Sequence, residues 1–426
     1  MKKEKMKTKN SVLVGIAVCA ILLTSPVLAS AGYSKIYGNA NEDEVLDMRD
    51  VTYIKLVIFG KKPATTFADA NYDGKISMLD IGQTKLIILG KEKQLTLVDQ
   101  ADRTVTINKP IEKVVLADLL DGVRTLVQLG AADKIVAINN YVENYALNPP
   151  DNYPWSPVLH AALELKELPS VGTYRDPNLE LIVSVKPDVI FAYSGATDVA
   201  NTLQETVGVP VVCIVGSGRS FLDFELHRLV GRVVDKEERA EELISYANEE
   251  ITKVSDVTAR IPDSEKPRVY LAFWSNWNGE SRTPTRYDPV DLAGGINVAG
   301  ELLPSSGSVA VTVSIEQIIA WNPDIILLHG VFPPHKLSKE TILSDPRLVT
   351  VNAVKNQEVN YTKGYMIGWD PAMGLTEAYY MAKLFHPDKF ENLDEEKEGN
   401  EILERFYGVD DLYTEMLDMS DRYRWE

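Results

Sequence analysis

The sequence predicts an α/β fold of two lobes, each with a parallel sheet, joined by a long spine helix and preceded by a small all-α calcium-loop unit. Three observations predict it. Apolar strand segments alternate with helical segments in two series, a long charged helical segment separates the series, and two Asp/Asn-rich loops precede both. Alternating strands and helices imply parallel sheets covered by helices. The expected boundaries are 1–31 for a leader, 32–92 for the calcium-loop unit, 95–219 for the first lobe, 220–262 for the spine and 263–426 for the second lobe with C-terminal helices.

Composition narrows the class of protein. The chain has 426 residues, with 62 Asp plus Glu against 44 Lys plus Arg, and a formal charge of −18. A hydrophobic fraction of 45% and a charged fraction of 25% are typical of a globular protein. The acidic balance argues against a nucleic-acid partner, since that would require a basic footprint.

The segment 1–31 has the three parts of a secretory signal peptide. Met1–Asn10 carries five lysines, Ser11–Ala29 is almost wholly apolar, and Ala29-Ser30-Ala31 offers small residues for cleavage. This pattern predicts export to the cell surface or beyond. The apolar run is long, so an uncleaved leader that anchors the protein in the membrane remains an alternative. After cleavage Cys213 is the only cysteine, in an apolar run that favours buried packing over reactivity.

Two loops that follow the leader place oxygen side chains at the spacing that Ca²⁺ requires. Ca²⁺ takes six to eight oxygen ligands, supplied by loop positions 1, 3, 5, 7, 9 and 12, with Gly at position 6 for a sharp turn. The second loop would supply them from Asp69, Asn71, Asp73, the carbonyl of Lys75, Ser77 and Asp80. The first loop would use Asn39, Asn41, Asp43, the carbonyl of Val45, Asp47 and Asp50. Its Glu44 stands where Gly is expected, so the alternative of a simple polar turn is stronger there.

An apolar helical segment follows each loop, at 51–59 and 81–89, and ends at Gly. Two such loop–helix units, with Asp rather than Glu at position 12, resemble a dockerin domain over about residues 37–90. The resemblance implies folding on Ca²⁺ and a cohesin-like module as partner. It also implies that loop positions 10 and 11, Met48-Arg49 and Met78-Leu79, choose the partner. The alternative for these residues is helix packing.

The main body contains the two series of strands and helices. An alternating segment at 95–107 with a turn at Asp102-Arg103 predicts a hairpin. The first series comprises strands at 113–117, 135–138, 189–193 and 211–215 and helices at 120–129 and 197–207. The second comprises strands at 268–273, 325–329 and 358–361, a helix at 316–321 and an acidic helical C-terminus.

The segment at 221–260 is charged and has apolar residues at helical spacing until Pro262. We expect a single helix of about 40 residues, roughly 60 Å long, that joins the lobes.

A sequence pattern is repeated between the two lobes. Asn178–Tyr193 and Ser314–His329 each read as a short helix, a Pro-Asp turn and a strand. The repeat predicts that the two strands occupy equivalent places, with Tyr193 and His329 at their carboxyl ends. Ligands of open α/β sheets bind at those ends.

The body also resembles the class III substrate-binding proteins of ABC importers, over about residues 95–387. The segments that carry the resemblance are 104–107 with Pro110 and 113–115, Leu129–Val136, Val171-Gly172, Pro177–Glu180, Lys186–Asp188 and the spine. It implies capture of iron–siderophore, haem or cobalamin and delivery to an ABC permease. In the family one exposed Glu on each lobe pairs with Arg of the permease, and Glu180 and Glu316 match those positions. The alternative is that both are solvated helix carboxylates.

Aromatic and basic residues near predicted strand ends are the candidates for the cleft. Aromatic rings supply stacking area, and Arg grips carboxylates through two hydrogen bonds. Such residues suit a small-molecule metal chelate, with iron–siderophore first and cobalamin or haem next. The candidates are Tyr174, Arg175, Tyr193, Trp274, Trp277, Arg282, Arg286, His329, Tyr365 and Trp369. For each aromatic alone, core packing is the competing interpretation.

Three functions are therefore compared. The first is an extracytoplasmic solute-binding protein for an ABC permease, and not an enzyme. The second is a surface scaffold or adhesion protein that has lost transport. The third is a polysaccharide-degrading enzyme carrying a dockerin, which would need two carboxylates about 5–10 Å apart in one cleft.

Overall fold

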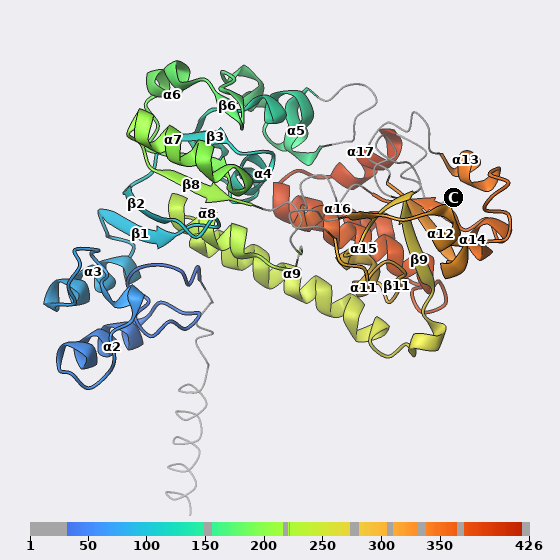
Figure 1. The fold of residues 1–426 in the computed structure, drawn as a ribbon, viewed down its shortest axis with the longest axis horizontal. Coiled ribbons are helices and arrows are strands. Elements are labelled where there is room, and N and C mark those ends of the chain that lie inside the picture. The colour runs from blue at the N-terminus through green and yellow to red at the C-terminus, as the bar shows by residue number, and fades with distance from the viewer. Residues whose placement is uncertain are drawn as a thin grey trace, which may run out of the picture.

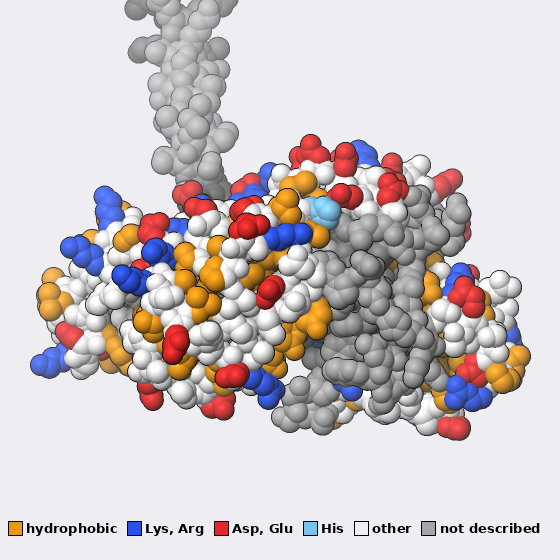
Figure 2. Space-filling model, turned by 90° about the horizontal axis from the view of Figure 1, so that it is seen from above, with side chains coloured by type: hydrophobic (Ala, Val, Ile, Leu, Met, Phe, Trp, Pro, Cys, Tyr) orange, Lys and Arg blue, Asp and Glu red, His pale blue; other side chains and the backbone are white. Residues whose placement is uncertain are grey.

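The computed structural model (Figure 1) describes residues 32–148, 156–215, 220, 222–272, 281–304, 310–329, 338–363 and 370–419. The predicted leader lies outside the described residues. Within them, no helix is both long enough and apolar enough to cross a membrane. In the view of Figure 2, acidic, basic and hydrophobic side chains are interspersed over the described surface.

The N-terminal unit, residues 32–92, is built from two loop–helix copies. Its elements are α2 (Met48–Ile58), the 3-10 turn η1 (Thr66–Ala68) and α3 (Met78–Ile88). Each helix begins earlier than the apolar pattern indicates, because loop positions 9 and 12 form a capping box. Asp47 and Asp50 form it on α2, and Ser77 and Asp80 on α3.

The N-terminal unit is joined to the body by a β-bridge to the first hairpin and by a shared core. The expected hairpin is present as β1 (Gln94–Val98) and β2 (Thr104–Asn108), antiparallel, with Asp102 in the turn at φ 57°. Ile36 forms a bridge with Leu97 on the free edge of β1, and Tyr37 N donates to Thr96 O at 2.9 Å. Ile36 is fully buried in the main hydrophobic core. The unit is thus packed directly on the first lobe.

The first lobe contains a parallel four-stranded sheet in the order β4-β3-β7-β8. The strands are β3 (Val114–Ala117), β4 (Ile135–Ala137), β7 (Val189–Tyr193) and β8 (Val211–Ile214), as the sequence predicts. A two-stranded hairpin of β5 (Gly172–Thr173) and β6 (Asp176–Pro177) lies beside it. The helices and turns are α4 (Asp121–Gln128), η2 (Ala132–Lys134), the π-helix η3 (Val142–Leu147), α5 (Pro157–Ala161), η4 (Leu163–Glu167), α6 (Leu179–Val185), η5 (Ser194–Ala196) and α7 (Thr197–Val207).

The spine corrects one prediction, since it is two helices and not one. α8 (Glu225–Val234) ends at Asp235, which adopts the left-handed conformation at φ 59°, and α9 (Glu237–Thr258) begins directly after Lys236. Asp tolerates this conformation better than most residues, and no periodicity signals it in advance. At 22 residues, α9 is about 33 Å long rather than the expected length of roughly 60 Å. It nevertheless runs beneath both lobes (Figure 1).

The second lobe repeats the topology of the first. Its parallel sheet has the order β11-β9-β13-β14, from β9 (Arg268–Ala272), β11 (Ile296–Asn297), β13 (Ile325–Leu328) and β14 (Val359–Tyr361). β10 (Arg282–Pro284) and β12 (Ala310–Thr312) pair antiparallel at its side. The other elements are η6 (Asp263–Glu265), α11 (Asp288–Leu292), α12 (Ile315–Trp321), α13 (Lys339–Leu343) and α14 (Asn352–Lys355).

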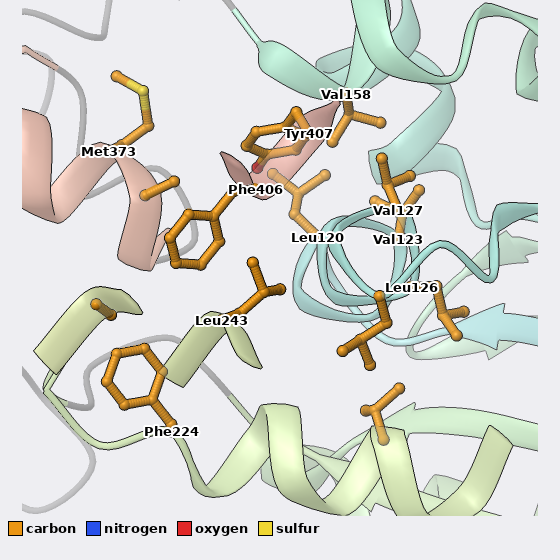
Figure 3. Packing of buried hydrophobic residues seen from close by; sticks show 14 of the residues in the cluster. Leu120, Val123, Leu126, Val127, Val158, Phe224, Leu243, Met373, Phe406 and Tyr407 are labelled. Carbon is orange, nitrogen blue, oxygen red and sulfur yellow. The ribbon is translucent and has the colours of Figure 1, made fainter. Parts of the chain in front are cut away.

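Three C-terminal helices connect the second lobe back to the first. They are α15 (Pro371–Phe385), α16 (Glu395–Tyr407) and α17 (Leu412–Met419). Figure 3 shows Phe406 and Tyr407 beside Leu120 and Val158 of the first lobe, in one continuous buried cluster. Burial of several large side chains there, at about 1.5–3 kcal/mol each, holds the lobes together.

A buried hydrogen-bond network lies beside that cluster. Gln128 Nε2 donates to Asp370 Oδ1 and to the Tyr407 hydroxyl, both at 2.9 Å, while Gln128 Oε1 is 2.7 Å from His227 Nε2. Arg124 Nε is 3.4 Å from Asp370 Oδ2. These groups come from α4, α8, the start of α15 and the end of α16, so the contact between the lobes is specific as well as apolar.

Candidate functional site

The carboxyl ends of the two sheets provide equivalent edges. In the first lobe the strand order is β4-β3-β7-β8, and in the second it is β11-β9-β13-β14. In each sheet the chain therefore runs outward in one direction from the first strand and then in the other, and this change of direction lies between β3 and β7 and between β9 and β13. Ligands of open α/β sheets bind outside this switch point. Tyr193 ends β7 at the switch point of the first lobe, and His329 follows β13 at that of the second. The predicted equivalence of these two residues is confirmed.

A cluster of tyrosines lies at the edge of the first lobe. The ring of Tyr193 contacts that of Tyr174 edge-on, with centroids 5.5 Å apart, and Tyr174 contacts Tyr141 at 5.7 Å. Tyr145 adds a fourth ring, 5.3 Å from Tyr141. The four rings come from β7, the turn of the β5–β6 hairpin and the segment after β4, and all are partly exposed. They form a polarisable, hydroxyl-bearing wall, which we call the tyrosine wall.

Arg175 places a positive charge on the tyrosine wall. Its guanidinium lies over the Tyr174 ring at 5.4 Å, and its Nε donates to the Tyr174 hydroxyl at 3.0 Å. Burial raises the pKa of Tyr193, as do the charge of Asp121 and the neighbouring Tyr174, so its hydroxyl is protonated at neutral pH. The wall can therefore stack on a ring and donate hydrogen bonds to an anionic ligand.

Tyr174, Arg175 and Tyr193 were predicted from the sequence and lie together here, whereas Tyr141 and Tyr145 were not predicted. The two missed residues lie four apart around a π-helix, and that spacing was the only signal available. π-helical turns often occur at functional sites.

An acidic pair is buried behind this edge, where β3 leads into α4. Asp118 is fully buried, and its Oδ2 accepts from Gly122 N at 2.7 Å. Burial raises the pKa of Asp118 to about 7, assisted by the charge of Asp121. A protonated Asp118 lets two carboxyl groups share this apolar position.

Three residues of the predicted set, His329, Arg282 and Arg286, lie in the described part of the second lobe. His329 is buried, and burial lowers its pKa to about 3, so the imidazole is neutral at pH 7. Arg282 begins β10 and is partly exposed. Arg286 is exposed and its Nε donates to Asp288 Oδ1 at 2.8 Å. Trp274, Trp277, Tyr365 and Trp369 lie outside the described residues.

The two predicted docking glutamates occupy matching positions on exposed helices. Glu180 lies in the first turn of α6, capped by Asn178, and Glu316 in the first turn of α12, capped by Ser314. Both side chains are exposed. Glu316 differs in its surroundings, since hydrogen bonds from its own backbone N–H and from Ser314, and the charge of Arg347, hold its pKa below the usual value.

A Pro-Asp turn fixes each of these helices against its sheet. Asp188 Oδ2 accepts from the backbone N–H groups of Glu112 and Lys113, both at 2.8 Å, at the start of β3. Asp324 Oδ2 accepts from Arg268 N at 3.0 Å at the start of β9. Equivalent Asp carboxylates thus tie β7 to β3 in the first lobe and β13 to β9 in the second, which explains why the Pro-Asp motif is repeated.

The second loop of the N-terminal unit has the turn geometry that its sequence predicts. Gly74 adopts φ 84°, and its N–H donates to Asp69 Oδ2 at 2.8 Å. Asp80 Oδ1 accepts from Asn71 N and its Oδ2 from Ser77 N. The carboxylates thereby hold the loop closed around its centre. No group of three His, Cys, Asp or Glu side chains suited to a metal occurs in the described part of the chain, so a cation here would rely on mixed amide, hydroxyl, carbonyl and carboxylate oxygens.

The first loop departs from this geometry at two positions. Glu44 does not adopt the positive φ of its counterpart Gly74. Asn39, at position 1, is buried, and its amide nitrogen donates to the carbonyls of Ser34 and Asp43. Its Oδ1 accepts no hydrogen bond in the described structure. An orphaned buried oxygen at a ligand position fits a loop that receives a cation.

Hydrophobic side chains are exposed on both helices of the N-terminal unit. Their exposed fractions are 54% for Met48 and 71% for Phe59 on the first copy, and 66% each for Met78 and Leu79 on the second. Asp47, Met48, Arg49 and Thr52 line a shallow hollow on α2. Exposed apolar side chains gathered on one small unit suit contact with another protein.

Comparisons with known proteins agree with this geometry. A family model described as periplasmic binding protein matches residues 120–366, more than half of the chain. The molybdate-binding protein MolA of Haemophilus influenzae is 25% identical over 336 residues, covering 73% of this chain and 90% of that protein. The Fe(3+)-citrate-binding protein YfmC of Bacillus subtilis is 24% identical over 200 residues, covering 45% of this chain and 58% of that protein. The solved structure of MolA bound to molybdate matches with a TM-score of 0.59 at 22% identity, over 74% of this chain and 98% of that one.

Proposed function

The chain belongs to the periplasmic binding protein family, and we propose that it captures a metal chelate between its lobes and delivers it to an ABC permease. Ferric siderophore is the first candidate, with cobalamin or haem next. The related proteins are solute-binding proteins of ABC transporters and not enzymes, as predicted. Membership also implies an exported protein, and either a cleaved leader or a retained anchor would be compatible with it.

The tyrosine wall carries the proposal. It lies at a topological switch point and combines ring faces with the Arg175 guanidinium. Arg282 and Arg286 of the second lobe would add further donors for carboxylate or catecholate oxygens. The two relatives described above are named for molybdate and ferric citrate, which are also metal-containing anions. Positive charge and hydroxyl donors suit such ligands.

Fluorescence titration of the full chain tests the ligand class. Ferric siderophore, ferric citrate, haem, cobalamin and molybdate are titrated separately into wild type and into Tyr174→Ala, Tyr193→Ala and Arg175→Ala. We expect saturable quenching by a ferric chelate and a loss of about tenfold or more in affinity for each variant, since a buried aromatic or charged contact contributes about 1–3 kcal/mol. Tyr53→Ala, a half-exposed tyrosine on α2, is the matched control. Absence of a response to all five ligands would contradict the proposal.

We further propose that the N-terminal unit is a dockerin-type attachment module that takes Ca²⁺ and a cohesin-like partner. The two oxygen-rich loops, the turn at Gly74 and the exposed methionines support this. Ca²⁺ would be held by Asp69, Asn71, Asp73, Ser77, Asp80 and the carbonyl of Lys75, and would supply folding energy rather than chemistry.

Attachment and transport make separate predictions. Ca²⁺-dependent capture by an immobilised cohesin module, lost on Met78→Ala plus Leu79→Ala, would support the module. A protein that binds the partner but none of the chelates would instead favour the surface-scaffold alternative. Because the N-terminal unit packs closely on the first lobe, partner capture and chelate binding are both measured on the intact chain.

A further inference from the structure

The two calcium-type loops differ in a side chain that directly contacts their carboxylates. Arg49 follows position 10 of the first loop, and its Nη1 is 3.1 Å from Asp43 Oδ2. Its Nε is 2.9 Å from Asp47 Oδ2 and 3.1 Å from Asp47 Oδ1. The guanidinium thus pairs with the carboxylates at positions 5 and 9 of its own loop.

The second loop has no such cation at the same place. The residue equivalent to Arg49 is Leu79, whose side chain is 66% exposed. The carboxylates of Asp69 and Asp73 accept hydrogen bonds from backbone N–H groups and from the Asn71 amide instead. Backbone N–H groups and the Asn71 amide carry no net charge, so the carboxylates of the second loop keep their negative charge. In the first loop the positive charge of Arg49 offsets much of the carboxylate charge.

A guanidinium and a Ca²⁺ ion compete for the same carboxylate charge. An arginine guanidinium does not lose its proton in a protein, so Arg49 cannot yield to a second cation by becoming neutral. A cation that enters the first loop must therefore displace the guanidinium or share its carboxylates. Like charges at a few ångströms repel.

The first loop nevertheless retains an oxygen that points to a cation. Asn39 is 1% exposed, and its Oδ1 is without a hydrogen-bond partner in the described structure. A buried amide oxygen in this state is costly unless a donor or cation reaches it. These features fit a weakened cation site better than a simple polar turn.

We propose that Arg49 is a built-in counter-cation of the first loop, so that the two loops take Ca²⁺ with unequal affinity and the second loop fills first. The inference rests on the proposed Ca²⁺ binding of the N-terminal unit and deepens it. Two exposed ion pairs each change an equilibrium by about twofold to fivefold, so Arg49 should weaken the first loop by about tenfold.

Reciprocal exchange of the two residues tests the proposal. Ca²⁺ is titrated calorimetrically into the full chain as wild type, Arg49→Leu, Leu79→Arg and the double exchange. Both positions are exposed, so neither substitution disturbs the core. Asp43→Asn or Asp73→Asn in each background removes one loop at a time and assigns each binding step, and circular dichroism checks the fold.

We expect two steps separated by about tenfold or more in wild type, with the tighter step lost in Asp73→Asn. Arg49→Leu should bring the steps together, Leu79→Arg should weaken the second loop by a similar factor, and the double exchange should reverse the order of filling. Equal affinities in wild type that Arg49→Leu leaves unchanged overturn this inference alone. Absence of Ca²⁺ binding in all variants overturns the proposed calcium module and this inference with it.

Discussion

The two lobes share a backbone plan but differ in what covers it. Both sheets have the same strand order, and a Pro-Asp carboxylate ties the third strand to the first in each. The first lobe is extended by the β1–β2 hairpin and the N-terminal unit and also contacts α16, whereas α15 packs on α11 of the second lobe. Because the two lobes share a backbone plan, the differences between their edges must come from the side chains that they carry at equivalent positions.

The equivalent edge positions show this difference most clearly. The first lobe presents partly exposed tyrosines in front of the buried acid Asp118, and the second presents the buried imidazole of His329. Burial disfavours the charged form of both groups: the carboxylate of Asp118, which is an acid, and the imidazolium of His329, which is the protonated form of a base.

The largest expected contrast is an opposite response of the lobes to acid. The pKa of His329 is lowered to about 3, so below pH 6.5 the unfolded chain takes up a proton that the folded chain refuses. Stability is lost as the pH falls from about 6.5 towards 3, by up to roughly 5 kcal/mol. The pKa of Asp118 is raised to about 7, so between about pH 4 and 7 the folded chain holds a proton that the unfolded chain has released. Its contribution declines as the pH rises through that window.

Neutral, nearly isosteric variants isolate the two groups. Urea unfolding of ligand-free wild type, His329→Gln and Asp118→Asn is measured from pH 4 to 8. His329→Gln should flatten the loss of stability on the acid side, and Asp118→Asn should flatten the loss between pH 5 and 7. Parallel pH profiles for wild type and both variants would contradict the contrast.

The next effect concerns the N-terminal unit, which packs on the β1–β2 hairpin of the first lobe. If Ca²⁺ holds the N-terminal unit, its removal should loosen the hairpin that pairs with Ile36, and not the second lobe. Ca²⁺ at about 100 times its dissociation constant stabilises the folded form by about 2.7 kcal/mol, so chelation should lower amide protection in β1 and β2 by up to about 100-fold. Hydrogen exchange with and without chelator measures this.

Protection in β9 and β13 is the internal control for that experiment. The Asp73→Asn variant in excess Ca²⁺ should reproduce the effect of the chelator in β1 and β2. Equal loss of protection in both lobes, or unchanged protection in the hairpin, would show that the unit and the first lobe are not coupled.

A smaller contrast is expected between Glu180 and Glu316, the two predicted docking glutamates. Glu316 lies in the field of Arg347, whereas no cation is associated with Glu180 in the described contacts. We expect Glu180→Ala to lower uptake through the cognate permease about tenfold and Glu316→Ala about threefold, with ligand affinity unchanged. Uptake into vesicles containing the permease is the measurement. Exposed Glu205 of α7 provides the control substitution. A loss of uptake in Glu205→Ala equal to that in Glu180→Ala would contradict a specific docking role.

Sequence patterns predicted the regular elements because apolar periodicity and turn residues are local signals. The pattern repeated between the lobes located β7 and β13 and their Asp188 and Asp324 carboxylates correctly. The break of the spine at Asp235 was missed, since a single left-handed residue leaves the helical spacing on either side intact. Pairings such as Tyr141 with Tyr174, and Arg49 with Asp43, depend on tertiary proximity or side-chain direction, which periodicity does not encode.

The smallest contrast concerns the residues that end helices α6 and α12. Lys186 ends α6 at φ 52° and Asn322 ends α12 at φ 46°, both left-handed. A lysine is strained there, so Lys186→Gly should stabilise the protein by about 0.5–1 kcal/mol. Asn tolerates the conformation, and its Oδ1 also accepts from Asn352 N at 2.9 Å. Asn322→Gly should therefore destabilise by about 1 kcal/mol. Denaturant midpoints of both variants measure the difference, and shifts of the same sign would mean that the two helix ends are equivalent in energy as well as in backbone.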